Sequence, residues 1–270
     1  MIIRNDNITE ASLGSASDLN ASIFLSNVSA AGGKITPVVI AAVDTLFKDL
    51  KSNGIWDKIL GFYPLIGGTS SSCAIEGKGT SRYDFLYANP EDAISGTITF
   101  SDNGIWSDLF MGSAETPPIA VGTSVASLFP SPDDIHLSVY SRTNRGATPN
   151  FVFGPAQTGN GRTCFNLNYD GDTYVSISGS VVIATLASTS GFFVMSKTPS
   201  YSSLLQNGTV VGTTTDPGSG QLESSPFAPL AERANIEAAF ISFGLALTDA
   251  QSIIYTNIVQ NFQTSLGRQV

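Results

Sequence analysis

Apolar residues recur at helical spacing in a segment near the start of the chain. Thr36 can cap a helix there, and Pro37 suits the first turn, where a missing N–H costs nothing. The apolar positions fall on one face of that helix, and they are Val39, Val43, Leu46, Phe47 and Leu50. Asn53 and Gly54 then supply a left-handed stop. The pattern predicts a helix over about residues 37–52.

The same periodicity returns at the end of the chain. Thr248 and Gln251 have the spacing of a capping box, and Gly267 suits the residue after a helix. The apolar stripe between them is wide, and it consists of Ile253, Ile254, Ile258, Val259, Phe262 and Leu266. So wide a stripe must be buried against a partner. We expect a helix over about residues 248–266, packed against the first helix at the flank or end of the domain, with Phe47 and Phe262 buried.

From residue 69 to about 246 the pattern changes to short strands separated by turn residues. Asn207-Gly208 is a strong hairpin signal, because both residues tolerate positive φ, and Asn103-Gly104 is a weaker one. Residues 213–234 hold too many turn residues for a strand and are predicted to form a surface loop. Many short strands without intervening helices predict a mainly β fold, an antiparallel sandwich or barrel.

Residues 1–34 differ from the rest of the chain in composition. They are rich in Asn, Ser, Ala and Gly, and one short apolar stretch, Ile23 to Val28, interrupts them. Such a segment can bury little apolar surface alone. We therefore predict an N-terminal attachment arm over residues 1–34 and a single domain over residues 35–270.

Charge and cysteine content narrow the range of functions. Charged residues make up 13% of the chain, against about 25% in an average soluble domain, and the net charge is −9. This balance argues against nucleic acid and anionic membranes as partners, since both attract a surplus of Lys and Arg. No apolar run reaches the length of about 18 residues that spans a bilayer. Cys73 and Cys164 could pair, but we expect two buried free thiols.

Four stretches in order carry a resemblance to a known family. They are "DTLFKDLKSNGIWDKILGFYPLIGG", "HLSVYSRT", "GFFVMSKT" and "FISFGLALTDAQSIIYTNIVQNFQTSLGRQ", and the ending "LGRQ" is the best single marker. From about Ala42 to Gln269 the chain resembles tailed-bacteriophage virion proteins with a concanavalin A-like, laminin-G-like jelly-roll domain. Residues 1–34 fall outside this resemblance.

The resemblance implies a non-enzymatic structural role in a virion, as a head or tail fibre, a spike or a capsid decoration. Its partners would be other virion proteins and further copies of this chain, a trimer by analogy with phage spikes. The alternative function is a receptor-binding, lectin-like adhesin that recognises bacterial surface glycans. The virion would be its location, after synthesis in the bacterial cytoplasm. The family offers no catalytic residue to carry over.

Two pairs of acidic residues are candidates for catalytic groups or metal ligands. Asp170 and Asp172 have the spacing of paired glycosidase carboxylates, but the Gly between them and the preceding "NLNY" indicate a turn, where Asp is common for backbone reasons. Asp133 and Asp134 also lie in a turn-like context. Calcium at either pair is an open alternative. We predict no catalytic, cofactor-binding or metal-binding residue.

His136 and three tyrosines are the other candidates. His136 is the only histidine, and its place at the start of a strand favours a structural role over a Ser-His relay or a zinc site. Tyr140, Tyr174 and Tyr201 lie in or next to strands and could form a platform for sugars. Strand alternation turns Tyr140 away from the core side, which makes it a candidate glycan or subunit contact beside Arg142, but an ordinary surface or second-layer tyrosine is the favoured interpretation.

Overall fold

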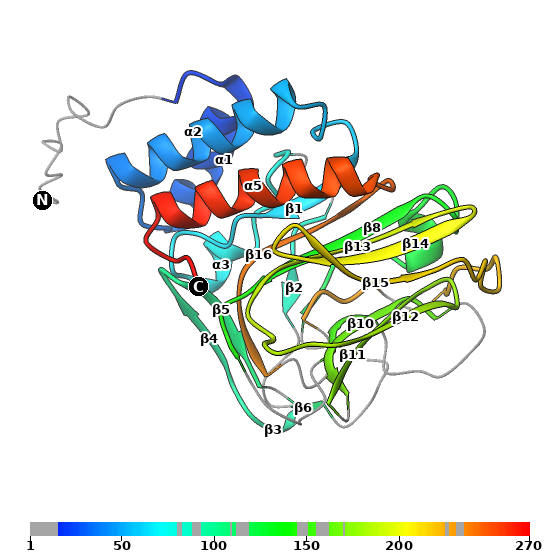
Figure 1. Cartoon of the computed structure of the whole chain (residues 1–270). Coiled ribbons are helices and arrows are strands. Elements are labelled where there is room, and N and C mark those ends of the chain that lie inside the picture. Colours follow the sequence, from blue (N-terminus) through cyan, green and yellow to red (C-terminus); the bar gives the residue numbers. More distant parts are fainter. Residues whose placement is uncertain are drawn as a thin grey trace, which may run out of the picture.

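Three layers make up the chain: helices, a large antiparallel sheet and a small antiparallel sheet (Figure 1). The computed structural model describes residues 16–79, 83–87, 93–108, 110–111, 119–144, 151–154, 162–169, 171–224, 227–230 and 235–270. The predicted mainly β sandwich with helices at both ends is confirmed. The helices are α1 (Leu19–Ala30), α2 (Pro37–Ser52), α3 (Ser70–Cys73), α4 (Val125–Leu128) and α5 (Asp249–Ser265).

The large sheet has the strand order β15-β14-β13-β8-β16-β5-β4, and β1 pairs with β16 beside β5. Its strands are β1 (Ile59–Tyr63), β4 (Ile98–Ser101), β5 (Gly104–Ser107), β8 (Ile135–Ser141), β13 (Gly191–Thr198), β14 (Tyr201–Gln206), β15 (Thr209–Thr214) and β16 (Ile236–Gly244). All of these pairings are antiparallel.

The small sheet has the order β12-β11-β10-β9. Its strands are β9 (Phe151–Phe153), β10 (Cys164–Tyr169), β11 (Asp172–Ile177) and β12 (Ser180–Thr185). Two short pairs complete the described strands: β2 (Leu86–Tyr87) with β7 (Ile119–Ala120), and β3 (Ala93–Ser95) with β6 (Phe110–Met111).

Both faces of the large sheet are buried, which separates the core into two parts. In β8 every residue is buried: Leu137 and Val139 face the small sheet, whereas Tyr140 faces the helices. In β13 Phe193 belongs to the core between the sheets and Phe192 to the core under the helices. Successive side chains of a strand point to opposite faces, so the two sides of each central strand contribute to two different cores.

Helices α2 and α5 begin where their caps predict. The Thr36 hydroxyl accepts the N–H of Val39, and Thr248 and Gln251 form a complete capping box. Phe47 and Phe262 are 0% and 2% exposed, and the two helices pack against each other, as predicted. They lie across the outer face of the large sheet (Figure 1).

The buried face of α5 differs from the predicted stripe. Ile253 and Ile254 are 41% and 37% exposed, while Tyr255 and Thr256 are buried in their place. The sheet beneath offers hydroxyl groups as well as apolar side chains, and the Tyr255 hydroxyl donates to Ser242 Oγ at 2.7 Å. A buried tyrosine needs such a partner, and this contact sets the rotation of the helix.

Residues 19–30 form a helix that the composition did not predict. Phe24 of α1 is buried against Phe47 of α2, with 5.7 Å between their ring centroids. Asp18 caps α1 and also binds Lys51 near the end of α2, 2.7 Å away. Residues 19–30 thus bury apolar side chains against α2 and not on their own. Residues 1–15 lie outside the described part, and an attachment role for the segment stays a prediction.

Two loops also differ from expectation. The β4–β5 hairpin turns at Asp102-Asn103 instead of Asn103-Gly104, because Gly104 is already in β5, where a Cβ would meet the carbonyl oxygen of Ala238 at 2.0 Å. The predicted surface loop over residues 213–234 places Phe227 in the core, 0% exposed, next to Phe243. Because the segment is rich in turn residues, its sequence did not predict that Phe227 is buried.

The end of the chain is fixed by Arg268, which is 1% exposed. Its Nε donates to Gln263 Oε1 at 2.9 Å, and its terminal nitrogens donate to the carbonyl oxygens of Leu65, Pro64 and Ala239 at 2.9 to 3.1 Å. Burial lowers the pKa of Arg268 to about 9, so the side chain stays charged at neutral pH. The guanidinium thus joins α5, the segment after β1, and β16.

Replacing Phe262 by Ala should lower the free energy of unfolding by about 3–5 kcal/mol, the usual cost of removing a core Phe ring. Ile254→Ala, on the exposed side of the same helix, should cost about 0.5 kcal/mol or less. Urea denaturation of both variants measures this difference. Equal costs at the two positions would show that α5 does not bury the face described here.

Candidate functional site

Tyr140 does not present its ring to solvent. Alternation in β8 placed it correctly opposite Leu137 and Val139, but α5 covers that face, and Tyr140 is 0% exposed. Its hydroxyl donates to Gln260 Oε1 at 3.2 Å and accepts the N–H of Val270 at 3.1 Å. The expectation of an outward glycan or subunit contact at Tyr140 is wrong, because the sequence did not reveal the helical layer above the strand.

The Tyr201 side chain also makes a structural contact. Its hydroxyl donates to Asp249 Oδ2 at 3.1 Å, and the neighbouring Ser203 hydroxyl donates to the other carboxylate oxygen at 2.6 Å. Asp249 is the first residue of α5, so Tyr201 and Ser203 hold the start of that helix against β14.

Tyr174 is the tyrosine that remains available. It is half-buried on the side of β11 that faces away from the core, and it lies in register with Asn166 of β10 and Ile183 of β12. Ile183 is 58% exposed. We name this surface the Tyr174 face; its members are Arg162, Asn166, Tyr174, Val181 and Ile183. It forms part of the outer surface of the small sheet (Figure 1).

The Tyr174 face combines an apolar platform with planar polar groups. The Arg162 guanidinium lies over the Tyr174 ring, 5.9 Å from its centroid, within range of a cation–π contact. Asn166 is 1% exposed, and its Oδ1 accepts the N–H of Asn168 at 3.1 Å, which fixes the orientation of the amide. Such a surface can pack on an apolar ligand face while the neighbouring guanidinium bonds to hydroxyls.

Two carboxyl groups among the described residues border the Tyr174 face: Asp172, two residues before Tyr174 on the same side of β11, and Glu223, beside Arg162. Burial raises the pKa of Glu223 to about 7, while the backbone N–H of Thr163 and the charge of Arg162 oppose this shift. Glu223 is therefore partly protonated near neutral pH. Burial also raises the pKa of the Cys164 thiol to about 11, so it is a thiol and not a nucleophilic thiolate at neutral pH. Cys73 and Cys164 are both buried and free, as predicted.

The acidic pairs take structural roles in the described residues. Asp133 forms an ion pair with Lys197, whose side chain is 0% exposed. Asp134 Oδ1 accepts the N–H of Ala246 at 2.8 Å, and Asp172 Oδ1 accepts the Thr185 hydroxyl at 2.6 Å. Asp170 lies outside the described residues. Over the described ranges, no group of three or more His, Cys, Asp and Glu side chains is arranged to hold a metal ion.

His136 lies under α5 in a sealed hydrogen-bond network. Its Nδ1 donates to the Leu245 carbonyl oxygen at 2.7 Å, so Nε2 faces the Ser242 hydroxyl, 3.4 Å away, as an acceptor. Ser242 also contacts Ser138 at 2.6 Å and accepts the Tyr255 hydroxyl. His136 is 0% exposed, so no substrate reaches the imidazole. The network joins β8, β16 and α5, which agrees with the structural role predicted for this histidine.

Sequence reasoning named Tyr174 but missed the residues beside it. Ile183 lies in "SVVIAT", where alternation makes Val182 a core residue and turns Ile183 outward, so this exposed position could have been found. The cross-strand pairing with Asn166 and the approach of Arg162 depend on register, which no local pattern in the sequence reveals.

Comparison with known proteins gives likeness in structure alone. No family model and no curated protein matches the chain. Solved structures with a similar arrangement include the binding domain of Paraclostridial Mosquitocidal Protein 1 (14% identity, TM-score 0.49), covering 76% of this chain and 53% of that one. The botulinum neurotoxin serotype D binding domain gives 10% identity and TM-score 0.48, with 77% and 52% covered. This chain thus spans about half the length of these two toxin domains.

Another similar structure is domain 4 of AbnA, an extracellular arabinanase from Geobacillus stearothermophilus, in complex with arabinotriose. It has 16% identity and a TM-score of 0.44, with 74% of this chain and 98% of that chain covered. Identities and TM-scores this low transfer no ligand, so the functional proposal depends on the side chains of this chain. In the part of the chain that the structure describes, no helix is both long and apolar enough to cross a membrane.

Acid should destabilise the chain through His136. Burial lowers the pKa of His136 from 6.5 to about 4, so the unfolded state takes up a proton at a higher pH than the folded state. Stability is therefore lost as the pH falls from about 6.5 to about 4, by up to about 3 kcal/mol from this group. Urea unfolding at a series of pH values measures the loss.

His136→Gln is the matched variant, because its amide can still donate to the Leu245 carbonyl but does not titrate. The difference in unfolding free energy between the native chain and this variant should change across that pH window. Parallel curves for the two proteins would contradict the shifted pKa.

Proposed function

We propose that this chain is a non-enzymatic recognition module that binds glycans on the Tyr174 face. The observation that supports it is the placement of Tyr174 in register with an exposed Ile183 and an oriented Asn166, beneath the Arg162 guanidinium. A pyranose ring has an apolar C–H face that packs on an aromatic ring, whose π face carries negative charge. The guanidinium group beside it can bond to the sugar hydroxyls.

The rigidity of this surface favours binding over catalysis. Tyr174 and Ile183 lie on β11 and β12, which pair in continuous register, and the Arg162 guanidinium lies over the Tyr174 ring. A site held by strands keeps its geometry without closing around the ligand. Retaining and inverting glycosidases need two carboxyl groups on opposite sides of the bond; of the two described acids that border this face, Asp172 accepts the Thr185 hydroxyl and Glu223 lies beside the Arg162 charge.

The location and assembly of the module follow from the sequence resemblance. We propose that it is displayed on a tailed-phage particle as part of a head or tail fibre, a spike or a capsid decoration, with other virion proteins and further copies of itself as partners. Binding of bacterial surface glycans fits a displayed adhesin better than a capsid protein that makes only structural contacts. The resemblance of residues 42–269, including the ending "LGRQ", is what supports the virion location.

Tyr174→Ala should weaken glycan binding at least about tenfold, because truncating a contact tyrosine commonly costs more than 1 kcal/mol. The measurement is an array of bacterial surface glycans followed by titration of the strongest ligand. Ile183→Asp should weaken binding as well. The matched control is Val210→Asp, at a strand residue of the large sheet that is 41% exposed. Equal loss at Val210, or unchanged binding in Tyr174→Ala, would exclude the Tyr174 face as the site.

The chain should release no products from the glycans that it binds. Incubation of the full chain with bacterial envelope polysaccharides should produce no new reducing ends, because Asp133, Asp134 and Asp172 are tied to structural contacts. If reducing ends appear and disappear in the Asp172→Asn or Glu223→Gln variant, the module is an enzyme and the proposal of a non-enzymatic role is wrong.

A further inference from the structure

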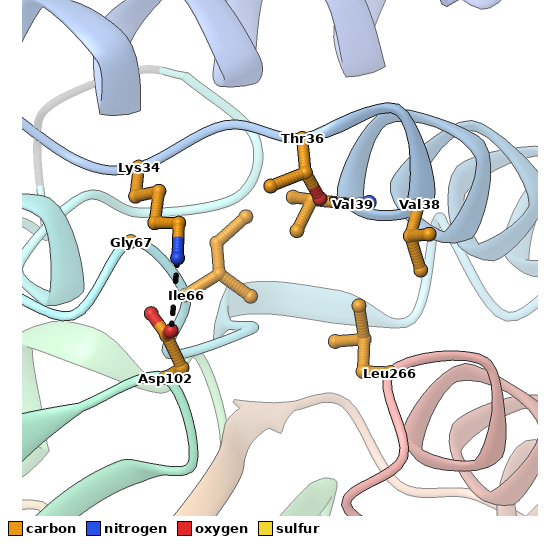
Figure 2. A pocket seen from close by; sticks show the side chains of 8 residues that line it. All are labelled: Lys34, Thr36, Val38, Val39, Ile66, Gly67, Asp102 and Leu266. Atoms are coloured by element: carbon orange, nitrogen blue, oxygen red, sulfur yellow. Dashed lines mark hydrogen bonds and ion pairs between the residues drawn. The ribbon is translucent and has the colours of Figure 1, made fainter.

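A small cleft lies on the helical side of the large sheet, away from the Tyr174 face. Figure 2 shows its walls: the start of α2 along one edge, and the β4–β5 hairpin with the end of α5 along the other. Its volume is about 170 Å³, below the range of about 300–1,000 Å³ that holds drug-sized ligands. The lining residues are Lys34, Thr36, Val38, Val39, Ile66, Gly67, Asp102 and Leu266. A ligand that fits it is therefore small.

One end of the cleft carries two opposite charges. Lys34 Nζ lies 3.7 Å from Asp102 Oδ2, and the two side chains are 69% and 71% exposed. An ion pair this exposed stabilises a protein by about 0–1 kcal/mol, so separating it to admit a ligand costs little. Neither side chain is held by the core, which leaves both free to turn toward a bound molecule.

The other end of the cleft is apolar. Val38 is 57% exposed although it lies in α2 beside buried residues, and it faces Leu266 across the opening (Figure 2). Ile66, 3% exposed, lies between the charged and apolar ends. Covering Val38 with an apolar group would remove exposed hydrocarbon from water, at about 25 cal/mol for each Å².

The charges are ordered across the cleft. Lys34 lies on the same edge as the first turn of α2, where the helix dipole is positive. Asp102 lies on the same edge as Leu266 at the end of α5, where the dipole is negative. One edge therefore favours an anion and the facing edge a cation. A ligand complementary to both edges carries the two charges side by side, next to an apolar group.

We propose that this cleft binds free α-amino acids with short aliphatic side chains. The amino-acid carboxylate pairs with the Lys34 ammonium, and the amino-acid ammonium pairs with the Asp102 carboxylate. The side chain then lies between Val38, Val39 and Leu266. The two charges of an α-amino acid lie about as far apart as those of an ion pair in contact. Binding of one molecule therefore breaks the Lys34–Asp102 ion pair and forms two new ion pairs with the ligand. This site is separate from the Tyr174 face and does not depend on glycan binding.

Isothermal titration of the full chain with L-leucine tests the proposal. The expected result is saturable binding with a Kd in the millimolar range, since the contacts are few and solvent-exposed. Two analogues each lack one charge: 4-methylpentanoate has no ammonium, and 3-methylbutylamine has no carboxylate. Each should bind about fivefold more weakly, the equivalent of one exposed ion pair. No binding of leucine at 50 mM (about tenfold above the expected Kd), or equal binding of either analogue, would overturn the proposal.

Substitutions separate this cleft from other places where leucine could bind. Lys34→Met and Asp102→Asn should each weaken leucine binding about fivefold. The matched control is Lys48→Met, which removes another exposed lysine whose Nζ lies 2.6 Å from Asp44 on the outer side of α2. Because Lys34 and Asp102 are exposed, their variants should unfold at the native temperature. Unchanged affinity in both cleft variants, or an equal loss in Lys48→Met, would show that leucine binds elsewhere.

Discussion

The buried guanidinium of Arg268 joins parts of the chain that lie about two hundred residues apart in sequence. Burying an ion away from water costs several kcal/mol unless hydrogen bonds compensate. Here the compensation comes from neutral oxygens: the Gln263 side chain and the carbonyls of Pro64, Leu65 and Ala239. Only a planar side chain with five N–H donors can reach all of these acceptors at once, and lysine cannot.

What Arg268 fixes is the helical layer. Its carbonyl oxygen accepts Arg142 Nε at 2.9 Å, and Arg142 in turn pairs with Glu237 of β16 at 2.6 Å. The last turn of α5 is thereby tied to two central strands of the large sheet. With α5 in this position the central strands β8, β13 and β16 are buried on both faces, and their aromatic side chains are not available as ligand contacts. The surfaces left for recognition are the outer face of the small sheet and the openings between the helices and the hairpins.

Features that depend on residues close together in the sequence could be predicted, whereas features that depend on the helical layer over the large sheet could not. Thr36, Pro37, Thr248 and Gln251 act within one helical turn, so the starts of α2 and α5 could be predicted from the sequence. The burial of Tyr140 could not be predicted, because alternation gives the side of a strand that a residue faces and not what covers that side. Helix α1 escaped prediction since its short apolar stretch is sufficient only when α2 offers Phe47 beside it. For the candidate site, strand alternation could have predicted that Ile183 is exposed, whereas the sequence could not predict its register with Tyr174.

Serine hydroxyl groups are part of the buried interface between the large sheet and α5. Ser196 Oγ donates to the Leu247 carbonyl at 2.7 Å and accepts the Leu247 N–H at 2.8 Å, and Ser242 accepts the Tyr255 hydroxyl. A purely apolar interface would allow a helix to settle in several positions of similar energy. Directed hydrogen bonds single out one of them, because any shift of α5 would leave buried hydroxyls unpaired. The low charge of the chain thus reflects an interior that uses neutral hydrogen bonds to place its last helix, and with it the edge of the cleft beside Leu266.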